Sequence, residues 1–93
     1  MSSKIEIHAI VKGRVQGVGF RWTVLKHASD IGIKGTVKNL SDGSVEIIAQ
    51  GTQTDLENLL ENIQKDSGIA KITSISKTVR PVSQQHSQFQ IVH

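Results

Sequence analysis

The sequence predicts an α+β fold with the element order β-α-β-β-α-β, followed by one more short strand. Two kinds of periodicity support this order. In five segments apolar and polar residues alternate or β-branched residues dominate, as in strands with one buried face. In two other segments apolar residues recur every three to four positions, as on the buried side of a helix. Two βαβ halves joined in this order give a four-stranded antiparallel sheet with both helices on one face, the ferredoxin-like arrangement.

The five predicted strands span residues 4–12, 33–40, 44–50, 69–80 and 89–92. The turn signal Ser41-Asp42-Gly43 joins the second and third strands into a hairpin. In the fourth strand the alternation slips near Ser74, which indicates a β-bulge. The fifth strand follows a polar loop and is short, so we expect it at an edge of the sheet.

The two helices are predicted from apolar residues at helical spacing. The first spans residues 20–31, and Gly32 suits the position just after its last turn. In the second, Thr54 is the expected N-cap and Glu57 completes a capping box. The pair Ser67-Gly68 is expected to end this helix. Its buried face is predicted to consist of Leu56, Leu59, Leu60 and Ile63.

Length and composition favour a single domain, residues 1–93, that works on a small anion. There is no cysteine, so disulfides and thiolate sites are excluded. No apolar run resembles a signal peptide or a membrane span, and we expect a cytoplasmic protein. The net charge, 11 − 8 = +3, comes from scattered cations, and only three residues are aromatic. Both features argue against nucleic-acid binding.

A glycine-rich stretch, Gly13 to Arg21, connects the first strand to the first helix. Glycine exposes backbone N–H groups, and the first N–H groups of a helix lie unpaired at its positive end. A loop that leads into a helix in this way is suited to hold an anion. Arg14 and Arg21 add two positive charges. The helix dipole opposes a cation in the first turn by about 0.3–1 kcal/mol, and a bound phosphate would remove that conflict.

The glycine pattern by itself leaves alternatives open. It is neither G-x-G-x-x-G nor a Walker loop, so dinucleotide binding and P-loop chemistry are disfavoured. A flexible strand-to-helix connection remains a second interpretation, because glycine clusters are usually turns. Asn39, near the end of the second strand, has two interpretations as well. It is either a turn residue or a carboxamide that orients a water molecule.

The usual catalytic groups are missing. The histidines are not spaced as metal ligands, and no carboxylate pair or activated serine stands out. The chain is therefore either a binder or an enzyme whose reaction needs no strong acid, base or nucleophile. An acyl phosphate meets that condition, because its leaving carboxylate has a conjugate acid with a pKa of about 4–5. Positioning and charge stabilisation are then most of what the protein must supply. The four histidines are His8, His27, His86 and His93.

Two stretches of the sequence resemble the signatures of the acylphosphatase family. They are Gly13-Arg14-Val15-Gln16-Gly17-Val18-Gly19-Phe20-Arg21 and the segment from Gly35 to Glu46. The resemblance extends over almost the whole chain, including Phe89-Gln90-Ile91. It implies a small ferredoxin-like enzyme that hydrolyses acyl phosphates to a carboxylate and inorganic phosphate, without metal or cofactor. Thr36 departs from the family pattern, in which an aromatic residue is frequent, and we expect this to affect packing only.

The resemblance also implies roles for particular residues. Arg21 would bind the substrate phosphate, and Asn39 would hold the attacking water through its carboxamide. With no side chain placed as a base, the substrate's own phosphate would accept the proton. The loop would bind the phosphate through backbone N–H groups, namely those of Val15, Gln16, Gly17, Val18, Gly19 and Phe20.

Two further readings compete with a stand-alone enzyme. One is a non-catalytic module that binds a phosphorylated metabolite or regulates a partner. The other is a domain of a larger carbamoyl-handling protein, although a chain that starts at Met1 and ends soon after a strand favours a separate enzyme. We expect a monomer with no membrane or nucleic-acid partner, and inorganic phosphate as both product and inhibitor.

Overall fold

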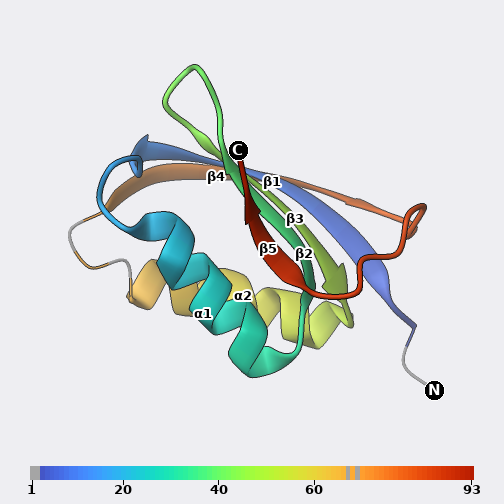
Figure 1. Cartoon of the computed structure of the whole chain (residues 1–93). Helices are drawn as coiled ribbons and strands as arrows, with labels where there is room; N and C mark the ends of the chain where they lie inside the picture. Colours follow the sequence, from blue (N-terminus) through green and yellow to red (C-terminus); the bar gives the residue numbers. More distant parts are fainter. Residues whose placement is uncertain (1–2, 67, 69) are drawn as a thin grey trace.

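A computed structural model describes residues 3–66, 68 and 70–93 of the chain, and they form a five-stranded sheet with two helices on one face (Figure 1). The fold is α+β and ferredoxin-like, as predicted. The elements in chain order are β1 (Ile5–Arg14), α1 (Phe20–Ile31), β2 (Lys34–Asn39), β3 (Val45–Gly51), α2 (Gln53–Lys65), β4 (Lys71–Arg80) and β5 (Phe89–Val92).

The strand order across the sheet is β4-β1-β3-β2-β5. The first four strands in this order pair antiparallel, as predicted. The terminal strand β5 lies at an edge, also as predicted, but it pairs parallel with β2, so the complete sheet is mixed. Parallel pairing follows from the path of the chain, because β4 ends at the same end of the sheet at which β2 begins. Residues 81–88 cross that end, and β5 starts beside Gly35, so it runs in the same direction as β2 (Figure 1).

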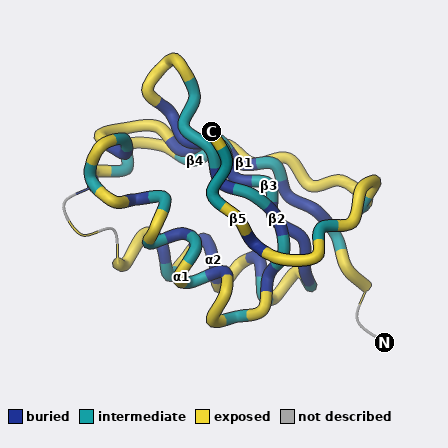
Figure 2. The backbone as a smooth tube through the Cα atoms, viewed as in Figure 1, coloured by how far each residue is buried: buried dark blue, intermediate teal, exposed yellow. Residues whose placement is uncertain are grey.

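The core lies between the sheet and the two helices. Helix α1 packs on β2 and β5, and α2 packs on β3 (Figure 1). The predicted apolar faces are the buried ones, while the hairpin turn and the outer sides of the helices remain exposed (Figure 2). The fully buried side chains include Ala9, Val11, Val24, Ala28, Val45, Ile47, Ala49, Leu59 and Ile63.

The predicted bulge in β4 is confirmed, and it lies where the glycine loop begins. The register of β1 against β4 shifts between Lys12, which faces Ser74, and Gly13, which faces Ile72. A Cβ atom on Gly13 would lie 2.0 Å from the carbonyl oxygen of Lys71, far inside van der Waals contact. Only glycine therefore allows the two strands to stay paired up to the start of the loop.

The predicted N-cap of α2 is wrong by two residues. Thr52, not Thr54, caps the helix, and its hydroxyl oxygen accepts a 3.2 Å hydrogen bond from the backbone N–H of Asp55. Strand β3 runs through Gly51, which pairs with Ile5, so Thr52 is the one residue left between strand and helix. The helix must begin immediately after it. The predicted end at Ser67-Gly68 includes a residue outside the described part of the chain, and α2 ends at Lys65.

Glu6 is an exception to the half-buried pattern of β1. It lies on the sheet face away from the helices, yet it is 3% exposed. Its partners lie on the two neighbouring strands, Arg80 at the end of β4 and Gln50 on β3. Arg80 Nε and Gln50 Nε2 both donate to the carboxylate, the latter at 2.7 Å. Gln50 Nε2 also donates a hydrogen bond to the carbonyl oxygen of Gln84, and Gln50 Oε1 accepts one from the backbone N–H of His86. This network holds the 81–88 segment on the sheet.

Burial by itself would raise the pKa of Glu6, but hydrogen bonds from Gln50 and Arg80, with the charge of Arg80, lower it overall. A carboxyl group whose pKa is lower in the folded chain than in the unfolded chain stabilises the fold fully at a pH above its unfolded-state pKa. That stabilisation is lost as the pH falls through its folded-state pKa. We therefore expect the free energy of unfolding to fall as the pH drops below about 4.5, the ordinary pKa.

Urea denaturation at a series of pH values measures this dependence. Glu6→Gln should flatten the acid-side slope, because the residue can no longer titrate. The exposed Glu57→Gln is the matched control and should keep the wild-type slope. A wild-type slope in Glu6→Gln would show that other groups govern the acid sensitivity.

Candidate active site

The glycine loop is anchored at both ends and exposed between them. Val15 and Phe20 are each 1% exposed and belong to the core. Gly17 and Gly19, which lie between these anchors, are exposed. Burial of the two apolar side chains therefore holds the ends of the loop, while the backbone between them remains accessible to a ligand.

Gly19 is the N-cap residue of α1 and adopts the left-handed conformation, with φ 78° and ψ 13°. A side chain would be strained there, and no side chain caps the helix. The N–H groups at the start of α1 therefore keep their capacity to donate to an anion. The first turn of α1 contains no acidic residue that would compete with one.

Arg21 lies in the first turn of α1, where the sequence placed it, and its side chain is half-buried. It forms no ion pair with a carboxylate in the described ranges 3–66, 68 and 70–93. Its positive charge thus adds to the positive end of the helix rather than being neutralised. This combination of a cation and unpaired N–H groups suits a phosphate.

Asn39 is the last residue of β2, opposite Val45. Its Oδ1 atom is buried and receives no hydrogen bond from the described protein groups. A buried acceptor without a partner costs about 1–3 kcal/mol, so native proteins rarely keep one unless it has a function. Asn39 Oδ1 can therefore accept a hydrogen bond from a water molecule or from a ligand.

The hairpin turn that follows Asn39 is held by its own side chains. Asp42 Oδ1 accepts a 2.9 Å hydrogen bond from the backbone N–H of Ser44 and a second bond from its hydroxyl group. Both hydrogen bonds lower the pKa of Asp42, and the one from the hydroxyl group has the larger effect. The turn is therefore rigid, which fixes the carbonyl groups of Leu40 and Ser44 in space.

The side chain of Gln16 joins the loop to this turn. Its Nε2 donates to the carbonyl oxygen of Leu40 at 2.7 Å and to that of Ser44 at 2.8 Å. The sequence had suggested only the backbone N–H of Gln16 as a contributor. No local signal identifies this contact, because its acceptors are backbone groups 24 and 28 residues away.

Two of the four histidines each contact one carboxylate. His8 Nε2 lies 2.8 Å from Glu46, across β1 and β3, and His27 Nε2 lies 2.9 Å from Asp66, between α1 and the end of α2. Over the described residues, no group of three or more His, Cys, Asp or Glu side chains could hold a metal ion. No helix among them is long and apolar enough to cross a membrane.

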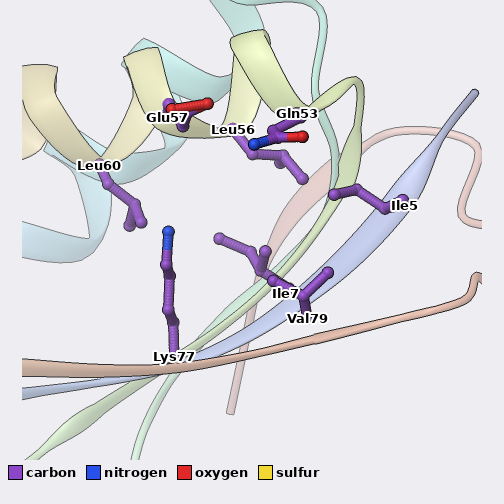
Figure 3. Close-up of a pocket in the computed structure, with 8 residues that line it drawn as sticks. All are labelled: Ile5, Ile7, Gln53, Leu56, Glu57, Leu60, Lys77 and Val79. Atoms are coloured by element: carbon purple, nitrogen blue, oxygen red, sulfur yellow. The ribbon is translucent and has the colours of Figure 1, made fainter. Parts of the chain in front are cut away.

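A groove between α2 and the strands β1 and β4 contains none of the candidate residues. Leu56, Leu60 and Ile7 form apolar walls, and Lys77 extends from β4 toward α2 (Figure 3). The groove includes neither the glycine loop nor Asn39. The candidate phosphate site lies instead at the end of the sheet where β1 leads into α1 (Figure 1).

Comparison with known proteins gives one consistent result. A family model described as Acylphosphatase matches residues 7–91. A Bacillus subtilis protein named acylphosphatase is 40% identical over 89 residues, which cover 96% of this chain and 98% of that protein. The crystal structure of acylphosphatase from Bacillus subtilis matches with a TM-score of 0.91, covering 96% of this chain and 99% of that one.

Full-length HypF, solved with phosphate and nucleotide bound, is 29% identical with a TM-score of 0.92, but the match covers only 12% of that larger chain. The fold thus defines a small ferredoxin-like α+β protein of the kind seen in these structures. The chain belongs to the acylphosphatase family.

Proposed function

We propose that this chain is an acylphosphatase that hydrolyses the carboxyl-phosphate bond of small acyl phosphates. Arg21 and the backbone N–H groups of residues 15–20 bind the phosphate, and Asn39 orients the attacking water. The single observation that carries the assignment of roles is the buried, unpartnered Oδ1 of Asn39. A water that donates one hydrogen bond to it would satisfy an acceptor that the protein leaves open.

The reaction is one displacement at phosphorus. The water oxygen forms a bond to phosphorus as the bond from phosphorus to the acyl oxygen breaks, and the electron pair leaves with the carboxylate. One water proton passes to an oxygen of the phosphoryl group, which departs as inorganic phosphate. The leaving carboxylate needs no general acid, since its conjugate acid has a pKa of about 4–5.

The protein then contributes position and charge. Negative charge spreads over the equatorial phosphoryl oxygens in the transition state, where an uncapped helix start and a guanidinium stabilise it. Both groups are already in place, because Gly19 leaves the helix uncapped and Arg21 has no carboxylate partner in the described chain. Catalysis requires no protein group to change its protonation state.

We also propose that the enzyme is a cytoplasmic monomer formed by a single domain, residues 1–93. The absence of cysteine fits a reducing compartment. Lys71, Lys77 and Arg80 lie on the edge strand β4, and charges of this kind oppose edge-to-edge pairing with a second chain. Light scattering on a size-exclusion column should give the mass of one chain, and a dimer mass would refute the monomer.

The purified chain should hydrolyse acetyl or benzoyl phosphate in the presence of EDTA, with competitive inhibition by inorganic phosphate. Arg21→Ala should lower kcat/KM by much more than tenfold, because it removes a charge-assisted contact with the transferred group. Lys26→Ala, which removes the same charge from an exposed position of the same helix, is the control and should stay near wild type. Phosphate binding without turnover would indicate a binding module instead.

Asn39→Ala should nearly abolish turnover without lowering the free energy of unfolding. The reason is that Oδ1 has no protein hydrogen bond to lose. Activity and urea denaturation are measured on the same preparation, with the exposed Asn58→Ala on α2 as control. Substantial activity in Asn39→Ala would remove the water-orienting role.

A further inference from the structure

We infer that the Gln16 side chain is a positioning residue, which sets the phosphate-binding loop at the correct distance from Asn39. The inference rests on the proposed function and deepens it. It begins with the path of β1 at the end of the sheet. Strand β1 pairs with β3 only as far as Val11, which faces Val45. Beyond that point β1 pairs with β4 alone, up to Arg14 opposite Lys71.

The backbone therefore carries the loop on the β4 side, away from the strand that bears Asn39. Asn39 lies at the end of β2, and β3 separates β2 from β1 in the sheet. Two halves of one site that are attached to different strands can shift relative to each other unless a contact joins them. Among hydrogen bonds of the described residues, the two made by Gln16 are the ones that join residues 15–20 to the 39–44 hairpin.

The acceptors of Gln16 are themselves fixed. The carbonyl oxygen of Ser44 also accepts a 2.8 Å bond from the backbone N–H of Leu40, and that of Leu40 accepts one from Gly43 at 3.2 Å. Ser44 is 3% exposed, so this part of the turn is shielded from water. One carboxamide thus uses both of its N–H groups on the two carbonyls that close the turn, and the first of them directly follows Asn39.

Gln16 does not need to touch the substrate for this role. Its backbone N–H belongs to the loop proposed to bind phosphate, and its side chain bonds to the hairpin proposed to orient the water. Loss of the side chain should leave phosphate affinity largely intact, since the loop backbone and Arg21 remain. It should lower kcat, because an error of about 1 Å between the reacting atoms is enough to lower a rate by up to a hundredfold.

Gln16→Leu keeps the approximate volume and removes both hydrogen bonds. We expect its kcat to fall by about tenfold to a hundredfold, while the inhibition constant for inorganic phosphate changes by less than about threefold. Gln64→Leu is the matched control, because Gln64 Nε2 also donates to a backbone carbonyl, that of Leu60, but on α2. The control should keep wild-type values for both constants.

Gln16→Glu keeps the shape of the side chain and tests the donor itself. An ionised carboxylate cannot donate to the carbonyl oxygens, but a protonated one can donate a single hydrogen bond. The ratio of its kcat to that of wild type should therefore rise as the pH falls through the carboxyl pKa. Gln16→Leu should show no such rise in the ratio.

A wild-type kcat in Gln16→Leu would overturn the inference. An equal loss of kcat and phosphate affinity would also overturn it, because the residue would then support the loop as a whole. A pH-independent ratio in Gln16→Glu would count against a donor role. Failure of the proposed function looks different, since the wild-type chain would show no turnover, or Arg21→Ala would retain full activity.

Discussion

The pairing of β1 with β3 ends at Val11 opposite Val45, and the geometry of the candidate site depends on that end point. Three more residues of β1 remain paired to β4, past the bulge in β4 between Ile72 and Ser74. The loop therefore separates from the neighbouring hairpin at the place where the proposed phosphate would bind. If β1 stayed paired with β3 for longer, backbone hydrogen bonds would fill the space that the phosphate and the water require.

Local features at this end of the sheet are unfavourable for stability but suited to binding. Arg21 lies in the first turn of a helix, Gly19 provides no side-chain cap, and Asn39 buries an acceptor without a partner. In a folded chain without a ligand, the first-turn cation costs about 0.3–1 kcal/mol, the glycine cap a few tenths of a kcal/mol, and the unpartnered acceptor about 1–3 kcal/mol. All three would be relieved by one bound phosphate with its attacking water. Such concentrated violations of local rules are expected at functional sites.

The rest of the molecule compensates for these features. Val15 and Phe20 bury the two ends of the loop in the core, so the exposed backbone between them has a fixed position. On the opposite face, Glu6, Gln50 and Arg80 fasten the 81–88 segment to the sheet, and β5 follows it along β2. The strand that ends in Asn39 is thus flanked by β3 on one side and β5 on the other.

The sequence by itself determined the element order, the buried faces and the glycine loop, because these depend on local periodicity and on backbone preferences. It also placed Gly32 at the end of α1 and Asn39 at the end of β2 correctly. The cap of α2 was misplaced, since Thr52 and Thr54 both precede an acidic residue at the right spacing. Only the length of β3 decides between them.

Tertiary structure alone decided the contacts that join distant segments. These contacts are the parallel pairing of β5 with β2, the hydrogen bonds that allow Glu6 to be buried, and the two hydrogen bonds of Gln16. They join residues that are 24 to 74 positions apart in the sequence. No local pattern specifies them, because a side chain's partner depends on where the chain folds back rather than on its neighbours. The glycine loop was visible in the sequence, whereas its attachment through Gln16 to the hairpin that follows Asn39 became visible only in the folded chain.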